Sequence, residues 1–404
     1  MDRLPHSIAI AGSEGFMGQN IVKAALGLDI EDIILSDPRI DPGRYAGLRN
    51  VRSVVPHHFN DIDAGLFHFA THPGQRSPMY RLIERGCHIN VEKPMVHPEN
   101  PMEAEAIFDA LEASNATLLY DFLEMFNPRT LAIVEMLKNM GDAQLDHITF
   151  IRGKNRENLW NPRNESPMLP IEYQETVHCM AYLVNLFANQ QGVYDINFES
   201  VFPKGFTVWA KSRRYDAPNP EKYPYVVDGY CAGTIDIGEC TVDFLTNFKR
   251  GAEKTKRKIM LGHNAYHSID IEVNDQLGQE YLRINGAEHQ PKGEQDQYKS
   301  VILGSWQMHQ EMMQGKRAVR PDARFAWLAF GLCGAIFMSS YLQTEVALRN
   351  QDDFNEAARF FNENAPSYKR GKYKAKSWYA LAKQYTIDWL DTEGRKDTMP
   401  KATG

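Results

Sequence analysis

The first 120 residues alternate short apolar runs with longer stretches in which apolar residues recur every three to four positions. Runs of the first kind are typical of buried strands, and stretches of the second kind are typical of helices that pack through one face. Strands that alternate with helices are joined by crossover connections, so this pattern predicts a doubly wound parallel sheet. We predict strands at 6–11, 32–35, 51–55, 66–71, 88–91 and 117–120, and helices at 17–28, 78–85 and 101–113.

The pattern changes after Pro128. One helix is predicted at 129–140, and most of the following apolar segments alternate with polar positions over short distances. Such segments favour an antiparallel sheet with one covered face, so we predict an α+β domain with a large open, mostly antiparallel sheet. We expect strands near 145–152, 195–202, 226–237, 239–248, 257–262, 268–273 and 280–284, a long ordered loop at 203–224, and helices between 305 and 349.

Three segments follow from these patterns. We predict a cofactor domain at 1–125, a substrate-binding and oligomerisation domain at 126–349, and a C-terminal extension at 350–404. The extension holds a helical pattern at 353–362, followed by a basic patch at 367–376. We expect the extension to wrap one of the domains or a neighbouring subunit.

The composition is that of a globular protein. Apolar residues make up 43% and charged residues 24% of the 404 residues, which are ordinary values. The formal net charge of −7 provides no basic field for nucleic acid or an anionic membrane, so neither is expected as a partner. Five cysteines without a C-x-x-C pair argue against a disulfide framework and against a thiolate zinc site.

The chain shows no sign of a targeting or membrane-spanning segment. Its first residues lack the basic and apolar regions of a signal peptide. The longest apolar stretch, 327–342, is too short to cross a bilayer and is flanked by Arg324 and Glu345. We therefore expect a buried helix at this stretch and a cytoplasmic protein.

A glycine turn joins the first predicted strand to the first predicted helix. Gly12, Gly15 and Gly18 lie in the segment GSEGFMG. The first glycine permits a tight turn, the second lets the backbone approach a pyrophosphate, and the third lets the helix pack closely on the strand. The N-terminus of the helix that follows offers free N–H groups and a partial positive charge to a phosphate, and Phe16 and Met17 lie at this junction. We predict a Rossmann-type dinucleotide site that includes these five residues.

Asp37 specifies the cofactor further. It ends the second predicted strand, at the place where a carboxylate accepts hydrogen bonds from ribose hydroxyls and repels a 2′-phosphate. NAD is therefore favoured over NADP, although Arg39 could serve a 2′-phosphate. Glu14 replaces the usual second glycine of the fingerprint. An ordinary strand–helix turn stays open as the alternative.

The segment GCHINVEKP, residues 86–94, resembles the G-x-H-V-x-x-E-K-P segment of the Gfo/Idh/MocA oxidoreductases, which include glucose-fructose oxidoreductase and inositol dehydrogenase. The chain is similar to this family over about residues 6–349. Further motifs agree in order and spacing: Thr71-His72-Pro73 with its T-P turn, Phe126-Asn127-Pro128 with its R-F-N-P, His178 with the histidine of its D-x-x-x-H, and the helix after Pro321 with its closing helix.

The resemblance implies a Rossmann domain, a second domain with an open antiparallel sheet, and NAD(P)-dependent oxidation or reduction of sugars, inositols or polyols. It also implies a homo-oligomer that assembles through the open sheet. Thr71, Pro73 and Glu92 would lie on the cofactor side. Lys93 would contact the substrate hydroxyl and the nicotinamide ribose, and His178 would be the general acid or base.

These roles suit the chemistry of the residues. Hydride transfer from a carbinol needs a base for the hydroxyl proton and a cation for the developing alkoxide. Histidine exchanges protons near neutral pH, and a lysine at the end of a parallel strand lies where ligands of such sheets bind. A surface Glu92–Lys93 pair and a core histidine at 178 are the structural alternatives.

The sequence departs from the family pattern at Gln174, where the D-x-x-x-H aspartate would lie. Glutamine cannot hold a charge or take a proton beside the substrate, but it can orient it. Glu172 or Glu175 would supply the missing carboxylate if the local turn is rearranged. Met125 and Ser77 replace the family's frequent arginine and histidine.

The segment 152–163 is rich in arginine and asparagine and includes a tryptophan. Arginine binds carboxylates bidentately and tryptophan stacks on sugar faces, so an acidic sugar is a candidate substrate, with a solvated loop as the alternative.

His263 and His267 lie in a strand-and-turn pattern, and we expect no metal site. The predicted substrate-binding residues are Lys93, Arg156, Trp160, Asn161, Arg163, Gln174 and His178.

The sequence therefore predicts an NAD-dependent sugar or polyol oxidoreductase. Two other functions stay open. A glycoside-cleaving enzyme would use transient oxidation by bound NAD, and a non-catalytic dinucleotide or sugar sensor would fit the loss of the aspartate at position 174.

Overall fold

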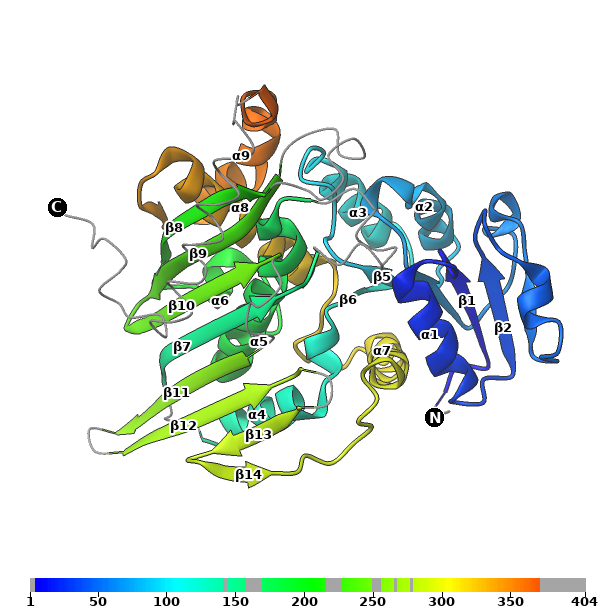
Figure 1. Cartoon of the computed structure of the whole chain (residues 1–404), viewed down its shortest axis with the longest axis horizontal. Helices are drawn as coiled ribbons and strands as arrows, with labels where there is room; N and C mark the ends of the chain where they lie inside the picture. The colour runs from blue at the N-terminus through cyan, green and yellow to red at the C-terminus, as the bar shows by residue number, and fades with distance from the viewer. Residues whose placement is uncertain are drawn as a thin grey trace. The chain divides into compact units, whose positions relative to one another are not determined.

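A computed structural model describes residues 4–140, 144–156, 169–215, 227–248, 256–264, 267–276 and 279–370. The chain forms two compact units (Figure 1). The first unit comprises 1–136, 184–197 and 291–328, and the second comprises 137–183, 198–290 and 329–404.

The first unit is built on a six-stranded, all-parallel sheet in the order β3-β2-β1-β4-β5-β6. All six predicted strands are present, and their interiors are apolar because helices cover the sheet. The doubly wound α/β prediction is thus confirmed. The strands are β1 (Ser7–Ala11), β2 (Asp32–Ser36), β3 (Val51–Ser53), β4 (Leu66–Phe69), β5 (His88–Glu92) and β6 (Thr117–Asp121).

Helices connect the strands of this sheet. These are α1 (Phe16–Leu26), α2 (Ser77–Glu84) and α3 (Glu103–Glu112), and α4 (Pro128–Asn139) follows the last strand. A later helix, α7 (Gln297–Met313), contacts α1 and β6. It begins at Asp296, whose carboxylate accepts from the backbone N–H groups of Tyr298 and Lys299, as an N-cap residue does.

The second unit contains a nine-stranded mixed sheet in the order β14-β13-β12-β11-β7-β10-β9-β8-β15. Only the β10–β7 pair is parallel among the described pairings of this sheet, so it is mostly antiparallel, as predicted. Its strands are β7 (Gln144–Gly153), β8 (Phe206–Tyr215), β9 (Val227–Ile237), β10 (Cys240–Asn247), β11 (Lys256–Asn264), β12 (His267–Asn274), β13 (Tyr281–Ile284), β14 (Ala287–His289) and β15 (Val346–Leu348).

Helices pack on one face of this sheet, among them α5 (Val177–Gln191), the short α6 (Phe198–Val201), α8 (Ala323–Leu342) and α9 (Gln351–Arg370). Helix α8 is long and apolar enough to cross a membrane by composition, but 72% of its apolar window is buried inside the structure. It is therefore a core helix, as predicted. Helix α9 packs on it, with the ring of Phe361 4.8 Å from that of Phe337.

Two predictions for the second unit are wrong. The segment 195–202 does not form a strand but contains the short helix α6. Val201 and Phe202 follow Phe198 by three and four positions, the spacing of one side of a helix, and all three residues are buried. The loop predicted at 203–224 contains β8, where Phe206 and Val208 are buried and the intervening residue is partly exposed. Prolines precede and follow β8, so the alternation of buried and exposed positions along this strand was read as part of a loop. Most of the basic patch at 367–376 lies outside the described residues.

Candidate active site

The glycine turn of the first unit leaves no room for side chains at two of its three glycines. Gly12 has a φ of +77°, and a Cβ there would lie 2.8 Å from the carbonyl oxygen of Ala70. A Cβ on Gly18 would lie 2.1 Å from the carbonyl oxygen of Gly12. The backbone therefore forms a close cradle that only glycine permits at these positions.

The N-terminus of α1 opens from this cradle. Gly15 is its N-cap residue and has no side chain to cap the helix, and the first turn from Phe16 carries no acidic residue. The first N–H groups and the positive end of the helix dipole are thus available to an anion. The cradle and the helix end together fit the pyrophosphate of a dinucleotide.

Asp37 follows β2 and is 3% exposed. Its carboxylate accepts from the backbone N–H of Glu14 at 3.2 Å, and from the backbone N–H and Nε of Arg39 at 2.9 and 3.2 Å. The carboxylate raises the pKa of the Arg39 guanidinium through a hydrogen bond and its charge. Asp37 therefore fixes the turn as well as lying where a ribose hydroxyl is expected.

Arg76 holds the loops after β4 and β5 and was not singled out from the sequence. It is 2% exposed. Its guanidinium donates to the carbonyl oxygens of Thr71 at 3.1 Å, Pro94 at 2.8 Å and Met95 at 3.2 Å, and to that of Glu92. One buried cation thus ties together the two segments that resemble the family's T-P and E-K-P motifs. A lone arginine beside a proline turn gives no sequence signal for this role.

Lys93 directly follows β5, at the carboxyl end of the parallel sheet, and is partly exposed. Its peptide bond to Pro94 is cis. Thr71 and the buried Pro73 lie at the end of the neighbouring strand, β4. The first unit therefore brings the predicted Thr71, Pro73 and Lys93 to the same edge of the sheet, where open α/β sheets bind their ligands.

His178 lies in the second unit, in the first turn of α5, and is 4% exposed. The preceding turn, Glu172–Thr176, is π-helical. Such turns insert an extra residue into a helix and occur frequently at functional sites. The two glutamates considered as replacements for the missing aspartate both lie in this turn.

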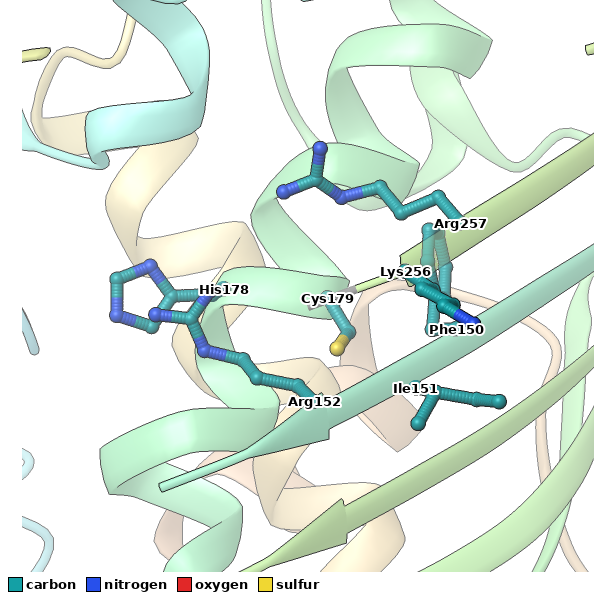
Figure 2. A pocket seen from close by; sticks show the side chains of 7 residues that line it. All are labelled: Phe150, Ile151, Arg152, His178, Cys179, Lys256 and Arg257. Carbon is teal, nitrogen blue, oxygen red and sulfur yellow. The ribbon is translucent and has the colours of Figure 1, made fainter. Parts of the chain in front are cut away.

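A pocket of about 190 Å³, including its open mouth, adjoins His178 (Figure 2). Figure 2 shows the guanidinium of Arg152 beside the imidazole and the sulfur of Cys179 facing the sheet. The lining residues come from α5, β7 and β11 and are Phe150, Ile151, Arg152, His178, Cys179, Lys256 and Arg257.

Glu175 links the π-helical turn to this pocket. It is fully buried, and it accepts from the Nε of Arg152 at 3.0 Å and lies 3.3 Å from the Nζ of Lys154. Two cations therefore flank one carboxylate next to the turn that carries His178. Arg257 also lines the pocket; it pairs with Asp275 and lies over the ring of Tyr182.

Glu172 and Gln174 occupy other environments. Glu172 is fully buried and accepts from the hydroxyl of Ser212. Burial, and then the charge of Asp228, raise its pKa to about 8. The side chain of Gln174 accepts from the backbone N–H of Leu169 at 3.0 Å. Of the two glutamates considered as replacements for the missing aspartate, Glu175 is the one that contacts a residue lining the pocket of His178.

The remaining predicted residues are placed only in part. Arg156 is 4% exposed, and its guanidinium lies over the ring of Phe248 at 5.7 Å. Trp160, Asn161 and Arg163 lie outside the described residues.

No protein-family model matches the chain, and no curated relative was found. Solved structures do match it. An oxidoreductase from Agrobacterium radiobacter in complex with NAD⁺, L-tartaric acid and magnesium is 14% identical, with a TM-score of 0.62 over 85% of this chain and 98% of the other. An aldose-aldose oxidoreductase from Caulobacter crescentus in complex with glycerol is 13% identical, with a TM-score of 0.65 over 85% and 99%.

A myo-inositol dehydrogenase from Corynebacterium glutamicum is 14% identical, with a TM-score of 0.60 over 85% of this chain and 99% of the other. These likenesses extend over nearly the whole of each solved chain. They include both the parallel and the open sheet. The chain therefore has the fold of the Gfo/Idh/MocA-type oxidoreductases, as the resemblance of its motifs implied.

Proposed function

We propose that this protein is an NAD-dependent oxidoreductase that transfers a hydride between the nicotinamide and a CH–OH group of a sugar, polyol or sugar acid. The glycine cradle at the uncapped end of α1 carries this proposal. The fold supports it, because similar structures are oxidoreductases, one of them crystallised with NAD⁺.

Gly12, Gly15 and Gly18, with the N–H groups at Phe16 and Met17, would hold the pyrophosphate. Asp37 would accept from the adenosine ribose, which favours NAD over NADP. When bound, the nicotinamide supplies the hydride chemistry that no side chain can provide.

Lys93 is proposed to stabilise the alkoxide that develops on the substrate. Its position after β5 places an ammonium group at the ligand-binding edge of the sheet. A positive charge there lowers the energy of a negative oxygen more than that of the neutral hydroxyl, which is the condition for catalysis. The hydrogen bonds of Arg76 to Glu92, Pro94 and Met95 hold the backbone on both sides of this lysine.

His178 is proposed to take the hydroxyl proton during oxidation and to return it during reduction. An imidazole does this near neutral pH without a large change in its pKa. Gln174 cannot share this proton. The pair of Glu175 and Arg152 would instead fix the local charge and the side-chain positions next to the histidine.

The cationic side chains beside His178 suit a substrate with an acidic substituent, whose carboxylate would compete with the ion pairs of Arg152 and Arg257. Arg152, Lys256 and Arg257 line the pocket, and guanidinium and ammonium groups bind carboxylates well. One protein of similar structure was crystallised with L-tartaric acid, a hydroxy acid.

Kinetics with matched substrates test this assignment. NADH formation should be measured with aldonates or uronates and with the corresponding neutral sugars. We expect Lys256→Gln to lower kcat/KM for the acids by about tenfold, because a contact with a charged group contributes about 1.4 kcal/mol and this energy corresponds to a factor of ten. The kcat/KM for the neutral sugars should not change. Lys258→Gln is the matched control, because this exposed lysine lies on the same strand and does not line the pocket. Equal activity on acids and neutral sugars would refute the acidic substrate class.

A further inference from the structure

The parallel sheet of the first unit has an unusually polar face. In a sheet covered on both sides, strand residues are expected to be apolar almost throughout. On β4, β5 and β6, however, alternate positions carry side chains that are buried and polar. These positions are His68, Asn90, Glu92, Thr117 and Asp121.

One part of this face is fully hydrogen-bonded. His88 lies 2.7 Å from the hydroxyl of Thr117, which lies 2.7 Å from Nδ1 of His309 on α7. Nε2 of His309 donates to Oδ1 of Asn90 at 2.9 Å, and the amide of Asn90 donates to the hydroxyl of Ser305 at 2.7 Å. Every donor along this path meets an acceptor. The sequence thus satisfies its buried polar groups here with side chains alone.

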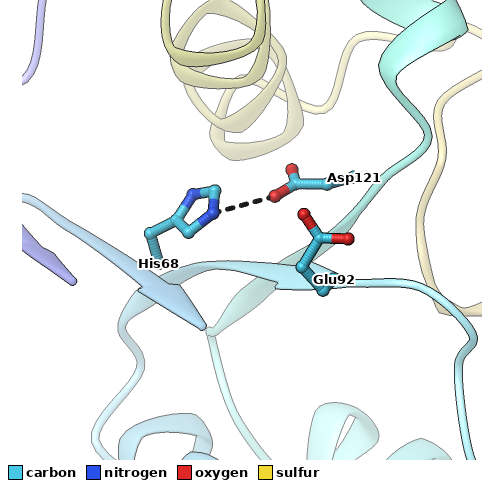
Figure 3. Close-up of side chains that lie close together, drawn as sticks. All are labelled: His68, Glu92 and Asp121. Carbon is cyan, nitrogen blue, oxygen red and sulfur yellow. Dashed lines mark ion pairs between the residues drawn. The ribbon is translucent and has the colours of Figure 1, made fainter. Parts of the chain in front are cut away.

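The adjoining part of the face is different (Figure 3). His68, Glu92 and Asp121, which we call the His68 cluster, each offer a ligand atom within 4.8 Å of the others. His68 is 0%, Asp121 1% and Glu92 8% exposed. Nε2 of His68 lies 3.1 Å from Oδ2 of Asp121. Neither ring nitrogen of His68 and neither oxygen of Asp121 makes a hydrogen bond within the described residues.

This arrangement is costly without a ligand. A buried polar atom that has lost water and gained no partner destabilises the fold. Two neighbouring carboxylates in a dry site also repel each other. The charge of the nearby Arg76 guanidinium lowers the pKa of Asp121, against the effect of burial and of Glu92. The hydrogen bonds described for Arg76 go to backbone carbonyls, however, so they supply no partner for the imidazole or the carboxylate.

We propose that the His68 cluster binds a divalent transition-metal ion through His68, Glu92 and Asp121. Adjacent ligands that are each about 2.1 Å from one ion lie roughly 3 Å apart, which agrees with the distance between His68 and Asp121. One imidazole and two carboxylates suit Zn²⁺, Mn²⁺ or Fe²⁺, whereas Mg²⁺ and Ca²⁺ prefer oxygen ligands alone. Three protein ligands leave a coordination position for water. Glu92 is the least buried of the three.

This inference does not depend on the proposed function, so its test uses metal binding rather than turnover. The full chain should be stripped with a chelator and titrated with Co²⁺, which reports its coordination through visible d–d bands, and then with Zn²⁺ in competition. We expect one Co²⁺ per chain, displacement by Zn²⁺ but not by excess Mg²⁺, and a metal-dependent rise in Tm.

His68→Gln and Asp121→Asn should each weaken binding more than tenfold, because each removes a ligand. Asp121→Asn keeps the shape of the side chain and therefore tests the ligand without a cavity. His6→Gln and Asp41→Asn, at exposed positions of the same unit, are the controls and should bind like the wild type. A stripped wild-type chain that binds no Co²⁺, or Co²⁺ binding that both ligand variants retain, would overturn the proposal. The first of these results would leave a proton shared by His68 and Asp121 as the occupant of the site.

Discussion

The two sheets of this protein place their functional groups in different ways. In the first unit, the backbone forms the proposed site: glycines form the cradle, a helix end provides N–H groups, and strand ends bring Thr71 and Lys93 to one edge. In the second unit, buried charges make it. Glu175 lies between Arg152 and Lys154, beside the pocket of His178.

This difference determines how each half responds to mutation. A site formed by closely packed backbone, such as the glycine cradle, tolerates changes of charge nearby but not a methyl group added to one of its glycines. A site built from buried ion pairs tolerates small changes of shape but not the loss of one partner, because the other charge then stays buried alone.

The largest expected effect concerns the two proposed catalytic residues, one in each unit. Lys93→Ala and His178→Asn should each lower kcat by about 10²–10⁴. The double variant should lose little more than the worse single variant, because groups that serve one reaction are not additive. Fully multiplicative losses in steady-state kinetics would mean that the two residues act independently.

Glu175→Gln should destabilise the protein by about 3–5 kcal/mol, because it removes the buried carboxylate that lies between the two cations Arg152 and Lys154. Urea unfolding measures this change. Asp195→Asn is the matched control. It breaks the ion pair with Arg324 at 2.7 Å, in which both side chains are more than 60% exposed, and should change the free energy of unfolding by less than about 1 kcal/mol. Equal effects of the two substitutions would remove the contrast between the units.

Gly18→Ala should destabilise the first unit by about 1–3 kcal/mol and weaken NAD binding, because the added methyl group meets the backbone of Gly12 and Ser13. Thermal unfolding and isothermal titration with NAD⁺ measure the two effects. Gly47→Ala, where a Cβ has nothing within 4 Å, should behave like the wild type. If Gly18→Ala keeps wild-type affinity, the cradle is not the cofactor site.

A pH dependence of the stability arises from Glu172. Its pKa is raised to about 8 in the folded state, so the folded chain binds a proton that the unfolded chain loses near pH 4.5. Stability should therefore fall as pH rises between these values. In denaturant titrations, the free energy of unfolding of Glu172→Gln should depend less on pH than that of the wild type. The variant should therefore become more stable relative to the wild type as the pH rises towards 8. Glu112→Gln, at an exposed position, should not. If the free energy of unfolding changes with pH in the same way in the wild type and in Glu172→Gln, burial does not raise the pKa of Glu172.

The same contrast explains what could be predicted from the sequence. The parallel sheet was predicted strand by strand, because short apolar runs and glycine turns reflect local rules. The apolar helix α8 was predicted to be buried for the same reason. The alternating pattern predicted the antiparallel sheet of the second unit, and 203–224 was mispredicted as a loop because prolines flank the alternating residues of β8.

The residues that could not be predicted act through distant partners. Arg76 holds carbonyls up to 19 positions away, and Glu175 pairs with Arg152, 23 positions away. His68, Glu92 and Asp121 come together only because β4, β5 and β6 are neighbours in register. The π-helical turn before His178 has no sequence signature at all.

The most direct test of the proposed function is whether the wild-type chain, supplied with NAD⁺ and a panel of polyols, monosaccharides and sugar acids, produces NADH. We expect NADH from at least one member of the panel, and loss of that signal in Lys93→Ala under conditions where the variant still binds NAD⁺. Tight NAD⁺ binding without turnover of any substrate would indicate a sensor. Cleavage of a glycoside without NADH accumulation would show that the net reaction is not a redox reaction, and either result would contradict the dehydrogenase assignment.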